Sequence, residues 1–383
     1  MPRRPLTLCL LSTVLLAACG DGTGPGGGMG RASMIAAASD YACALDREGQ
    51  VWCWGAGSLG QLGNGETQDS RSPRAVAGGL SVRQVSTGDF HACALTTADV
   101  AWCWGTNFTG VLGIGSTTGR EPVPLEVAGG HKFAALSAGG SHTCALDFSE
   151  TAWCWGQGDN GRLGSGDTLD LFIPSLVRTP LKFASLSSGF SHTCGLTPEG
   201  DAYCWGSNFR GQLGDGDTLD AVVPKPVTGG SKFQVIDAGG YHTCALSETG
   251  EAYCWGNDVT AELGDGRLVP GAVVNPVAVS GHRRFTRLSV GNYHACAITT
   301  EGAGWCWGQS VYGKLGNETY FPTPVPVAVA GGHIFKGIAA ASNHTCAADK
   351  DGQLFCWGRN SLGQLGTGER GDAFAPVEVA PLE

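Results

Sequence analysis

Seven pairs of cysteines recur along the chain, and nine residues always separate the two members of a pair. Each pair lies in a near-copy of one phrase, H-T-C-A-L-x-x-x-G-x-A-W-C-W-G, and successive copies begin 50 to 52 residues apart. A fixed period of this length is typical of stacked supersecondary units, because a single unit cannot bury its apolar faces alone. The pairs are Cys43 with Cys53, Cys93 with Cys103, Cys144 with Cys154, Cys194 with Cys204, Cys244 with Cys254, Cys296 with Cys306, and Cys346 with Cys356.

The two cysteines of a pair are predicted to face each other across a β-hairpin. In the first copy, Gly49 suits the left-handed position of a three-residue loop between two β-favouring runs. If Asp46 pairs with Gln50, then Cys43 lies opposite Cys53 at a non-hydrogen-bonded position, where Cα atoms are about 4.5 Å apart and a disulfide fits. Units two and three lack the loop glycine, and we expect their turns to differ.

The N-terminus predicts export and a lipid anchor. Arg3 and Arg4 precede an apolar run over residues 6–18, which is typical of a secretory signal peptide and too short to span a membrane. Residues 16–19, L-A-A-C, resemble the lipobox of bacterial lipoproteins, in which Cys19 receives a diacylglyceryl group. We therefore expect a signal peptide over residues 1–18, a lipidated cysteine with a flexible glycine-rich tether over 19–31, and a folded domain over 32–383. Sorting between the inner and outer membrane stays open.

Export decides the chemistry of the repeat cysteines. Of the sixteen cysteines, Cys9 leaves with the signal peptide and Cys19 carries lipid, so fourteen remain as seven pairs. Thiols outside the cytoplasm form disulfides, and no C-x2-C pair of the structural zinc type occurs. We therefore predict one hairpin disulfide per repeat and no metal.

Two further strands are expected in each repeat, which gives the four antiparallel strands of a propeller blade. A proline recurs in the last strand of every unit, and this strand is expected to be outermost because proline is tolerated chiefly on sheet edges. The tryptophan before the final glycine of each W-C-W-G is expected to pack between neighbouring blades. The prolines are Pro73, Pro122, Pro174, Pro224, Pro276, Pro324 and Pro376, and the tryptophans are Trp54, Trp104, Trp155, Trp205, Trp255, Trp307 and Trp357.

These motifs resemble the regulator of chromosome condensation repeat family, whose units carry G-x-x-H-T-x-A-L, aromatic-x-W-G, N-x-x-G-Q-L-G and G-D-T segments. Residues 207–214 (S-N-F-R-G-Q-L-G) and 216–218 (G-D-T) match closely, and the resemblance covers about residues 32–380. The resemblance implies an all-β, seven-bladed β-propeller. The family includes a Ran nucleotide-exchange factor, ubiquitin-ligase and signalling modules, and a secreted bacterial inhibitor of β-lactamases.

Charge and spacing argue against several functions. Exchange activity in that family depends on a protruding wedge, for which repeats that differ by only two residues in length leave no room. With 24 basic against 34 acidic residues the chain would be repelled by a phosphate backbone, so we expect no nucleic-acid partner. There is no G-x-S-x-G nucleophile elbow, and the G-x-G-x-x-G match at residues 55–60 opens no helix, so we expect neither an enzyme nor a cofactor.

Two repeated polar features are interpreted as structural. A histidine precedes the first cysteine of units two to seven, with no carboxylate or nucleophile at a fixed offset, so we expect hydrogen-bonding roles rather than metal binding or catalysis. The acidic turns at residues 166–170 and 215–220 are expected to be capped by side chains, with calcium binding left open. The histidines are His91, His142, His192, His242, His294 and His344.

The residues that vary between units favour a binding function. Up-and-down strand order places the turns between strands one and two, and those between strands three and four, on one face of the ring. Exposed aromatic rings among polar groups mark protein-binding surfaces, although some of these rings could instead fold inward over the glycines. The candidate partner-binding residues are Phe90, Phe108, Phe190, Phe209, Arg210, Tyr241, Tyr293, Tyr312 and Arg359.

We therefore expect a non-enzymatic protein-binding or scaffolding module, monomeric and held at the bacterial cell envelope by its lipid anchor alone. Its partner would be an unknown protein or a cell-wall component. A carbohydrate- or cell-wall-binding module is the alternative, and nucleotide exchange is a more remote one.

Overall fold

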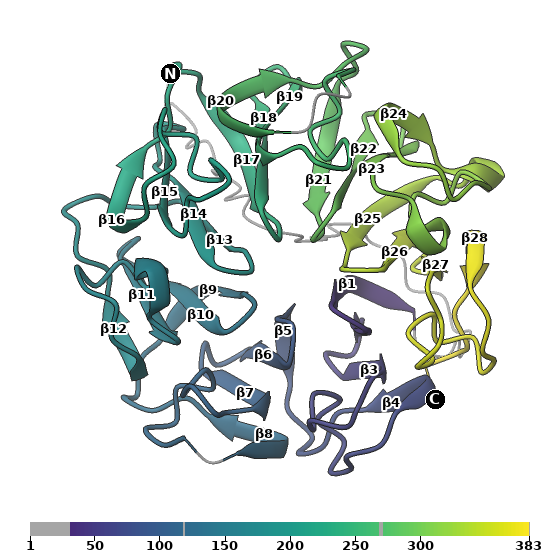
Figure 1. Ribbon diagram of the computed structural model, residues 1–383. Coiled ribbons are helices and arrows are strands. Elements are labelled where there is room, and N and C mark those ends of the chain that lie inside the picture. The colour runs from purple at the N-terminus through teal and green to yellow at the C-terminus, as the bar shows by residue number, and fades with distance from the viewer. Residues whose placement is uncertain (1–30, 118, 268–270, 383) are drawn as a thin grey trace, which may run out of the picture.

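The computed structural model describes residues 31–117, 119–267 and 271–382, so the expected signal peptide and the expected lipidation site Cys19 lie outside the described residues. The described chain forms a closed ring of seven four-stranded antiparallel sheets, the blades of a β-propeller (Figure 1). Within each blade the strands pair in chain order, so each repeat builds one whole blade. The predicted all-β, seven-bladed fold is confirmed.

The blades are short and closely alike, and the recurring prolines lie in the fourth, outermost strand of each, as predicted. Blade 1 comprises β1 (Ala32–Ala38), β2 (Tyr41–Asp46), β3 (Val51–Gly55) and β4 (Ser70–Ala75). Blade 2 comprises β5 (Val82–Thr87), β6 (His91–Thr96), β7 (Ala101–Thr106) and β8 (Arg120–Glu126). Blade 3 comprises β9 (Phe133–Ala138), β10 (His142–Asp147), β11 (Ala152–Gly156) and β12 (Leu171–Leu176). Blade 4 comprises β13 (Ser185–Ser188), β14 (His192–Leu196), β15 (Ala202–Gly206) and β16 (Ala221–Pro226).

The remaining three blades follow the same order. Blade 5 comprises β17 (Phe233–Ala238), β18 (His242–Ser247), β19 (Ala252–Asn257) and β20 (Ala272–Ala278). Blade 6 comprises β21 (Phe285–Val290), β22 (His294–Thr299), β23 (Gly304–Gly308) and β24 (Thr323–Ala328). Blade 7 comprises β25 (Phe335–Ala340), β26 (His344–Asp349), β27 (Leu354–Gly358) and β28 (Ala373–Glu378). Within residues 31–117, 119–267 and 271–382, three short 3-10 turns lie between strands, and they are η1 (Asp159–Gly161), η2 (Val311–Gly313) and η3 (Ala330–Gly332).

The hairpin between the second and third strands of each blade carries the predicted disulfide. In blade 1 the Asp46 N–H donates to the Gln50 carbonyl at 3.0 Å, and the register places Cys43 opposite Cys53. All seven predicted pairs are bonded in this way, with 4.1 Å between the paired Cα atoms. This close approach is that of a non-hydrogen-bonded antiparallel pair, so the register argument is confirmed. The bonds join Cys43 to Cys53, Cys93 to Cys103, Cys144 to Cys154, Cys194 to Cys204, Cys244 to Cys254, Cys296 to Cys306, and Cys346 to Cys356.

The same turn forms in the two blades that lack the loop glycine, so the expectation of different turns is wrong. Asp99 and Glu150 adopt φ values of 63° and 60°, in the left-handed region that Gly49 occupies at 86°. The backbone bond that closes the loop is retained, for example from the Asp147 N–H to the Thr151 carbonyl at 3.1 Å. The flanking sheet therefore imposes a backbone conformation that costs a non-glycine residue about 1 kcal/mol.

Removing one disulfide tests how much a hairpin depends on it. Replacing Cys194 and Cys204 together by alanine frees a short loop in the unfolded chain, and we expect the free energy of unfolding to fall by about 3 kcal/mol. Urea denaturation of the oxidised protein measures this change. The same pair of replacements at Cys93 and Cys103 serves as a replicate, and an unchanged urea midpoint in both variants would contradict the expectation.

A tryptophan in the third strand of each blade joins it to the preceding blade, as predicted. All seven of these indoles are fully buried. Trp104 of blade 2 donates its Nε1–H to the Gln61 carbonyl of blade 1 at 3.0 Å. Its ring lies against Gly63, where an added Cβ would come within 2.6 Å of the indole, and Gly63 and its six counterparts have φ between 66° and 69°. This contact therefore requires glycine both for space and for backbone conformation.

Blade 7 meets blade 1 through the ordinary blade contact, so no strand is borrowed to close the ring (Figure 1). The Trp54 Nε1–H donates to the Gln364 carbonyl at 3.0 Å, across the junction. The Ala32 N–H donates to the Gly352 carbonyl at 3.0 Å, and this bond has a counterpart at each of the other six interfaces. Closure is thus noncovalent.

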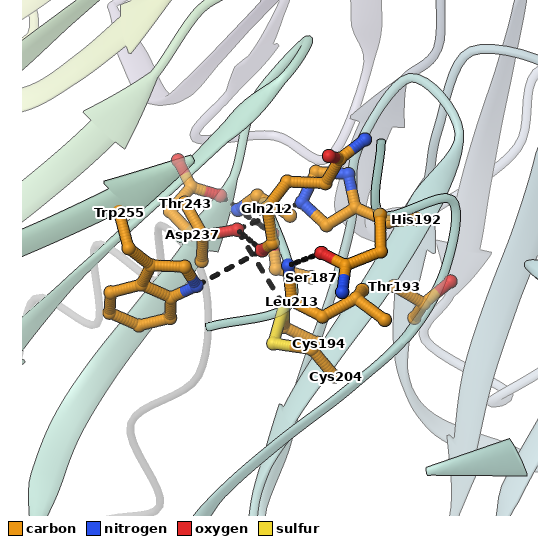
Figure 2. Close-up of a disulfide and its surroundings, with 12 residues drawn as sticks. Ser187, His192, Thr193, Cys194, Cys204, Gln212, Leu213, Asp237, Thr243 and Trp255 are labelled. Carbon is orange, nitrogen blue, oxygen red and sulfur yellow. Dashed lines mark hydrogen bonds between the residues drawn. A yellow bond between two sulfur atoms is a disulfide. The ribbon is translucent and has the colours of Figure 1, made fainter. Parts of the chain in front are cut away.

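The repeated histidines belong to a hydrogen-bonded latch between blades (Figure 2). The Thr243 hydroxyl of blade 5 donates to the Gln212 carbonyl of blade 4 at 2.8 Å, and the same carbonyl accepts the Trp255 Nε1–H at 3.0 Å. Because that hydroxyl hydrogen is used, the Thr243 oxygen accepts from His192 Nε2 at 2.9 Å, which places the imidazole proton on Nε2. The latch is missing where alanine replaces threonine: Ala295 leaves His242 Nε2 buried without a partner.

Two opposite substitutions test the latch. Thr243→Ala leaves the His192 Nε2–H buried and unpaired, so we expect the free energy of unfolding to fall by about 1–3 kcal/mol. Ala295→Thr makes the reverse change by giving His242 Nε2 an acceptor, and we expect the free energy of unfolding to rise by about 1 kcal/mol. Urea denaturation measures the free energy of unfolding of both variants. If the two substitutions changed it in the same direction, the latch would be refuted.

Candidate protein-binding face and central channel

One face of the ring carries most of the large hydrophobic side chains that are exposed among the described residues. We call the aromatic face the side formed by the turns between first and second strands and the loops between third and fourth strands. Among the described residues, eleven of the nineteen exposed large hydrophobic side chains lie on this face, six lie on outermost strands and two lie on the opposite face. Such an unequal distribution makes the aromatic face the candidate binding surface.

Four predicted site residues from blades 4, 5 and 6 form one group, which we call the aromatic cluster. The ring centroid of Tyr241 lies 5.7 Å from that of Phe190, 5.7 Å from that of Phe209 and 6.3 Å from that of Tyr293. Phe209 is 54% exposed and Phe190 is 37% exposed, whereas the two tyrosines are half-buried beneath them. The rings are tilted or edge-on to one another, as their quadrupoles favour.

Three cations on this face lie over aromatic rings, an arrangement that is attractive because of the negative ring face. Arg210, on the cluster, makes no ion pair with any described residue, so its charge is available to a partner. The pairs, with the distance from the cation to the ring centroid, are Arg210 on Phe209 (5.4 Å), Lys314 on Tyr293 (5.3 Å) and Arg359 on Tyr312 (5.4 Å).

The remaining predicted residues do not join the cluster. Tyr312 lies at the tip of η2 with φ of 67°, and together with Arg359 it forms a second, smaller group across blades 6 and 7. Phe90 and Phe108 lie in blade 2 and are 41% and 65% exposed, without a ring contact to the aromatic cluster. The candidate set is therefore divided between three places on one face.

A residue at one repeated position beneath the aromatic face ties loops to the next blade, and these residues were not predicted. Lys314 Nζ donates to Gln309 Oε1 at 2.8 Å and to the Ser342 carbonyl of blade 7 at 2.9 Å. Burial lowers the pKa of Lys314 to about 7, although the nearby Glu262 carboxylate opposes this shift. The sequence feature that could have revealed this position is the residue before L-G in each loop, because it varies from blade to blade. These residues are Gln61, Val111, Arg162, Gln212, Glu262, Lys314 and Gln364.

A central channel of about 190 Å³ runs between the first strands of the seven blades. Side chains on these strands link adjacent blades along it: Ser187 Oγ accepts from the Ala238 N–H at 2.9 Å and donates to Asp237 Oδ1 at 2.7 Å (Figure 2). Asp237 Oδ2 accepts from the Val290 N–H at 2.7 Å. Burial raises the pKa of Asp237 to about 6, against the effect of these hydrogen bonds.

The acidic turn at residues 215–220 is satisfied by the protein itself. Lys225 Nζ lies 3.0 Å from Asp215 Oδ2 and 3.7 Å from Asp217 Oδ2, and Asn208 Nδ2 donates to Asp215 Oδ1 at 2.9 Å. Asp220 Oδ1 caps the loop by accepting the Asn208 N–H at 2.8 Å. In the part of the chain that the structure describes, no three His, Cys, Asp or Glu side chains are grouped to hold a metal ion. Side-chain capping, as expected, accounts for this turn.

Two sets of buried groups have shifted pKa values of opposite effect on stability. Burial lowers the pKa of four of the repeated histidines to about 3 and that of the other two well below 6.5. Burial also raises the pKa of three aspartates to about 6. The histidines at about 3 are His91, His192, His242 and His344, and the aspartates are Asp89, Asp237 and Asp258.

The protein should lose stability on mild acidification. Each histidine binds a proton in the unfolded chain but not in the folded one between pH 6.5 and 3, so its contribution, complete above pH 6.5, falls by about 2 kcal/mol by pH 5. The aspartates act in the opposite sense, because their folded pKa is raised, but they are half as many. We therefore expect a lower urea midpoint at pH 5 than at pH 7, and an equal or higher midpoint would contradict the assignment of neutral histidines.

The fold and the aromatic face define a repeat-built β-propeller whose variable loops gather on one side. Residues 24–280 match the RCC1-like domain family. Residues 285–314 with 335–364, and 301–348 with 351–383, match two models of the regulator of chromosome condensation (RCC1) repeat. The chain therefore belongs to the RCC1-like propeller family.

Curated relatives match part of the chain. The ultraviolet-B receptor UVR8 of Arabidopsis thaliana is 30% identical over 147 residues, which are 38% of this chain and 33% of the receptor. The human E3 ubiquitin-protein ligase HERC2 is 28% identical over 148 residues, 37% of this chain and 3% of the ligase. The matches thus span a third or less of these relatives.

Solved structures share the whole fold. Prp20p of Saccharomyces cerevisiae has a TM-score of 0.78 at 22% identity, covering 92% of this chain and 87% of that one. Human WBSCR16 has a TM-score of 0.79 at 21% identity, covering 86% and 94%. At this identity the likeness is one of fold alone. No helix within the described residues has the length and apolar character needed to cross a bilayer.

Proposed function

We propose that this chain is a non-enzymatic protein-binding or scaffolding module of the bacterial cell envelope, and that the aromatic face holds its partner. The observation that carries the proposal is the concentration of exposed aromatic side chains on one side of a closed ring, with the unpaired Arg210 beside Phe209. Aromatic and arginine side chains supply much of the binding energy at protein interfaces.

Structures of the same fold support a protein partner. Prp20p was studied for its binding to Gsp1p and histones, and a second structure joins Prp20 to Kap60. In such folds the strands supply the scaffold and the loops supply the function. This chain is only 22% identical to Prp20p, so its partner is expected to differ too.

The envelope location rests on two features. Residues 1–19 have the charge, the apolar run and the terminal cysteine of a lipoprotein signal, so Cys19 would carry the anchor. Seven disulfides in one domain belong to an oxidising compartment. A propeller on a glycine-rich tether would then reach partners close to the membrane.

A cell-wall polysaccharide is the weaker candidate. Sugars bind aromatic side chains by stacking on a flat exposed ring. The rings of the aromatic cluster lie at 53°, 72° and 46° to one another, so they present no shared plane. This uneven surface fits the side chains of a protein better than the flat faces of a sugar chain.

A pull-down with the soluble domain tests the proposal. The bait is incubated with envelope extract, and in a separate arm with purified cell wall. We expect one envelope protein to be recovered in amounts comparable to the bait by the wild type, and its recovery to fall at least tenfold with the Phe209→Ala/Tyr241→Ala double variant, because the cluster is removed.

The matched control is Phe148→Ala, since Phe148 is 64% exposed in the turn between β10 and β11 on the opposite face. It should recover the partner like the wild type. Circular dichroism checks that the double variant is folded. Equal recovery by all three proteins, or retention by cell wall alone, would count against the aromatic face as a protein-binding surface.

A further inference from the structure

The mouth of the central channel contains a carboxylate that the protein does not neutralise. Asp89 lines this mouth on the aromatic face, in the turn between β5 and β6. It is half-buried, and its carboxylate makes no hydrogen bond and no ion pair with any described residue. The other side chains at the mouth are uncharged, and they are Ser39, Phe190, Asn292 and Ser342.

The surroundings of Asp89 make the negative charge of its carboxylate energetically unfavourable. Burial, and secondarily the negative charge of Asp40, raise the pKa of Asp89 to about 6. The nearby cations are engaged elsewhere, because Lys314 donates to Ser342 and Gln309, and Arg359 lies 3.8 Å from Asp40. An unpaired carboxylate in a partly desolvated site favours binding of a cation.

The channel wall next to this mouth fits an alkyl chain. Small apolar side chains line it on several of the first strands, and they are Ala38, Ala138, Ala238, Val290 and Ala340. The channel volume of about 190 Å³ accommodates one long side chain. Lysine and arginine bury an alkyl stem along apolar surface while their charged end finds a polar partner.

We propose that the channel mouth binds a lysine or arginine side chain of the protein partner, with the alkyl stem along the apolar wall and the cationic end at Asp89. A metal ion fits less well, because several oxygen ligands would have to converge and the described residues contain no such group. The source of the side chain rests on the proposed function. The cation site itself does not, since a free probe can occupy it.

The site is continuous with the aromatic face through Phe190. This ring lines the channel mouth, and its centroid lies 5.7 Å from that of Tyr241 in the aromatic cluster. A partner seated on the cluster therefore has the channel within reach of a neighbouring residue. The other charged groups that line the channel are Asp237, whose oxygens both accept hydrogen bonds, and Arg287, in the first half of β21.

The probe is N-acetyl-arginine methylamide, and its uncharged isostere N-acetyl-citrulline methylamide is the ligand control. Amide chemical shifts of the soluble domain are followed by NMR at pH 7. We expect the arginine probe to shift the amides of Gly88, Asp89 and Phe190 in a saturable way, and the citrulline probe to leave them unchanged. In the Asp89→Asn variant the dissociation constant for the arginine probe should rise at least tenfold.

Matched variants separate this proposal from the preceding one. Asp351→Asn removes an exposed carboxylate from the turn between β26 and β27, on the opposite face, and should bind the arginine probe like the wild type. The Phe209→Ala/Tyr241→Ala variant should also retain it, even if it loses the protein partner. Asp89→Asn should in addition raise the urea midpoint at pH 7, because it removes an unpaired negative charge. At pH 4 the Asp89 carboxyl is protonated and already uncharged, so the substitution should leave the urea midpoint unchanged. Equal binding of the two probes, or unaltered arginine binding by Asp89→Asn, would overturn the proposal.

Discussion

The ring depends on the contact between the indole of each blade and a left-handed glycine of the blade before it. A blade on its own exposes two apolar faces, so each sheet becomes stable only when neighbours cover both. The contact fills that role seven times with the same geometry, and at five interfaces the indole also donates to a backbone carbonyl. Because the indole is large and the glycine has no side chain, neighbouring sheets approach closely.

The junction between blades 7 and 1 shows how the indole–glycine contact helps to close the ring, because some of the other inter-blade links are missing there. Around the channel a serine or aspartate links neighbouring first strands, but Ala36 and Ala339 stand at that position in blades 1 and 7. Ala42 likewise replaces the latch threonine in blade 1. Closure therefore rests on Trp54, on backbone bonds such as Ala32 to Gly352, and on side-chain contacts such as that from Gln364 Nε2 to Asp40 Oδ1 at 3.1 Å. The ring is closed by packing and repeated backbone pairing rather than by a special strand.

This division of labour leaves the aromatic face free to vary. The strands, the disulfides and the indole contacts recur in every blade, whereas the loop residues differ from blade to blade. Side chains beneath the loops, such as Lys314 and Arg162, hold the turns of the following blade in place, so the exposed rings rest on a fixed base. A preorganised surface loses little conformational entropy when a partner binds. The channel mouth adds a charged pocket to this surface.

Periodicity made the fold predictable, and local chemistry made the hairpin register predictable, because Asp46 and Gln50 flank a loop of known geometry. The turns at Asp99 and Glu150 were mispredicted, since the sheet outweighs the local preference for glycine. For the candidate binding site, the sequence predicted which face of the ring carries it but not which side chains lie together. Which rings meet depends on which blades adjoin, so Phe190 and Tyr241 cluster while Phe90 does not. Lys314 and Asp89 gain their character from burial that only the closed ring creates.

The indole hydrogen of Trp54 reports directly on the closed ring. Its hydrogen–deuterium exchange can be followed by NMR beside that of two other indoles. Trp104 donates to the equivalent carbonyl, that of Gln61, between two blades that follow each other in the chain, and Trp102 is half-buried. We expect Trp54 Nε1–H to exchange slowly, on the scale of Trp104 and far more slowly than Trp102. Exchange of Trp54 as fast as that of Trp102 would show that blades 7 and 1 are not joined, and would contradict the account.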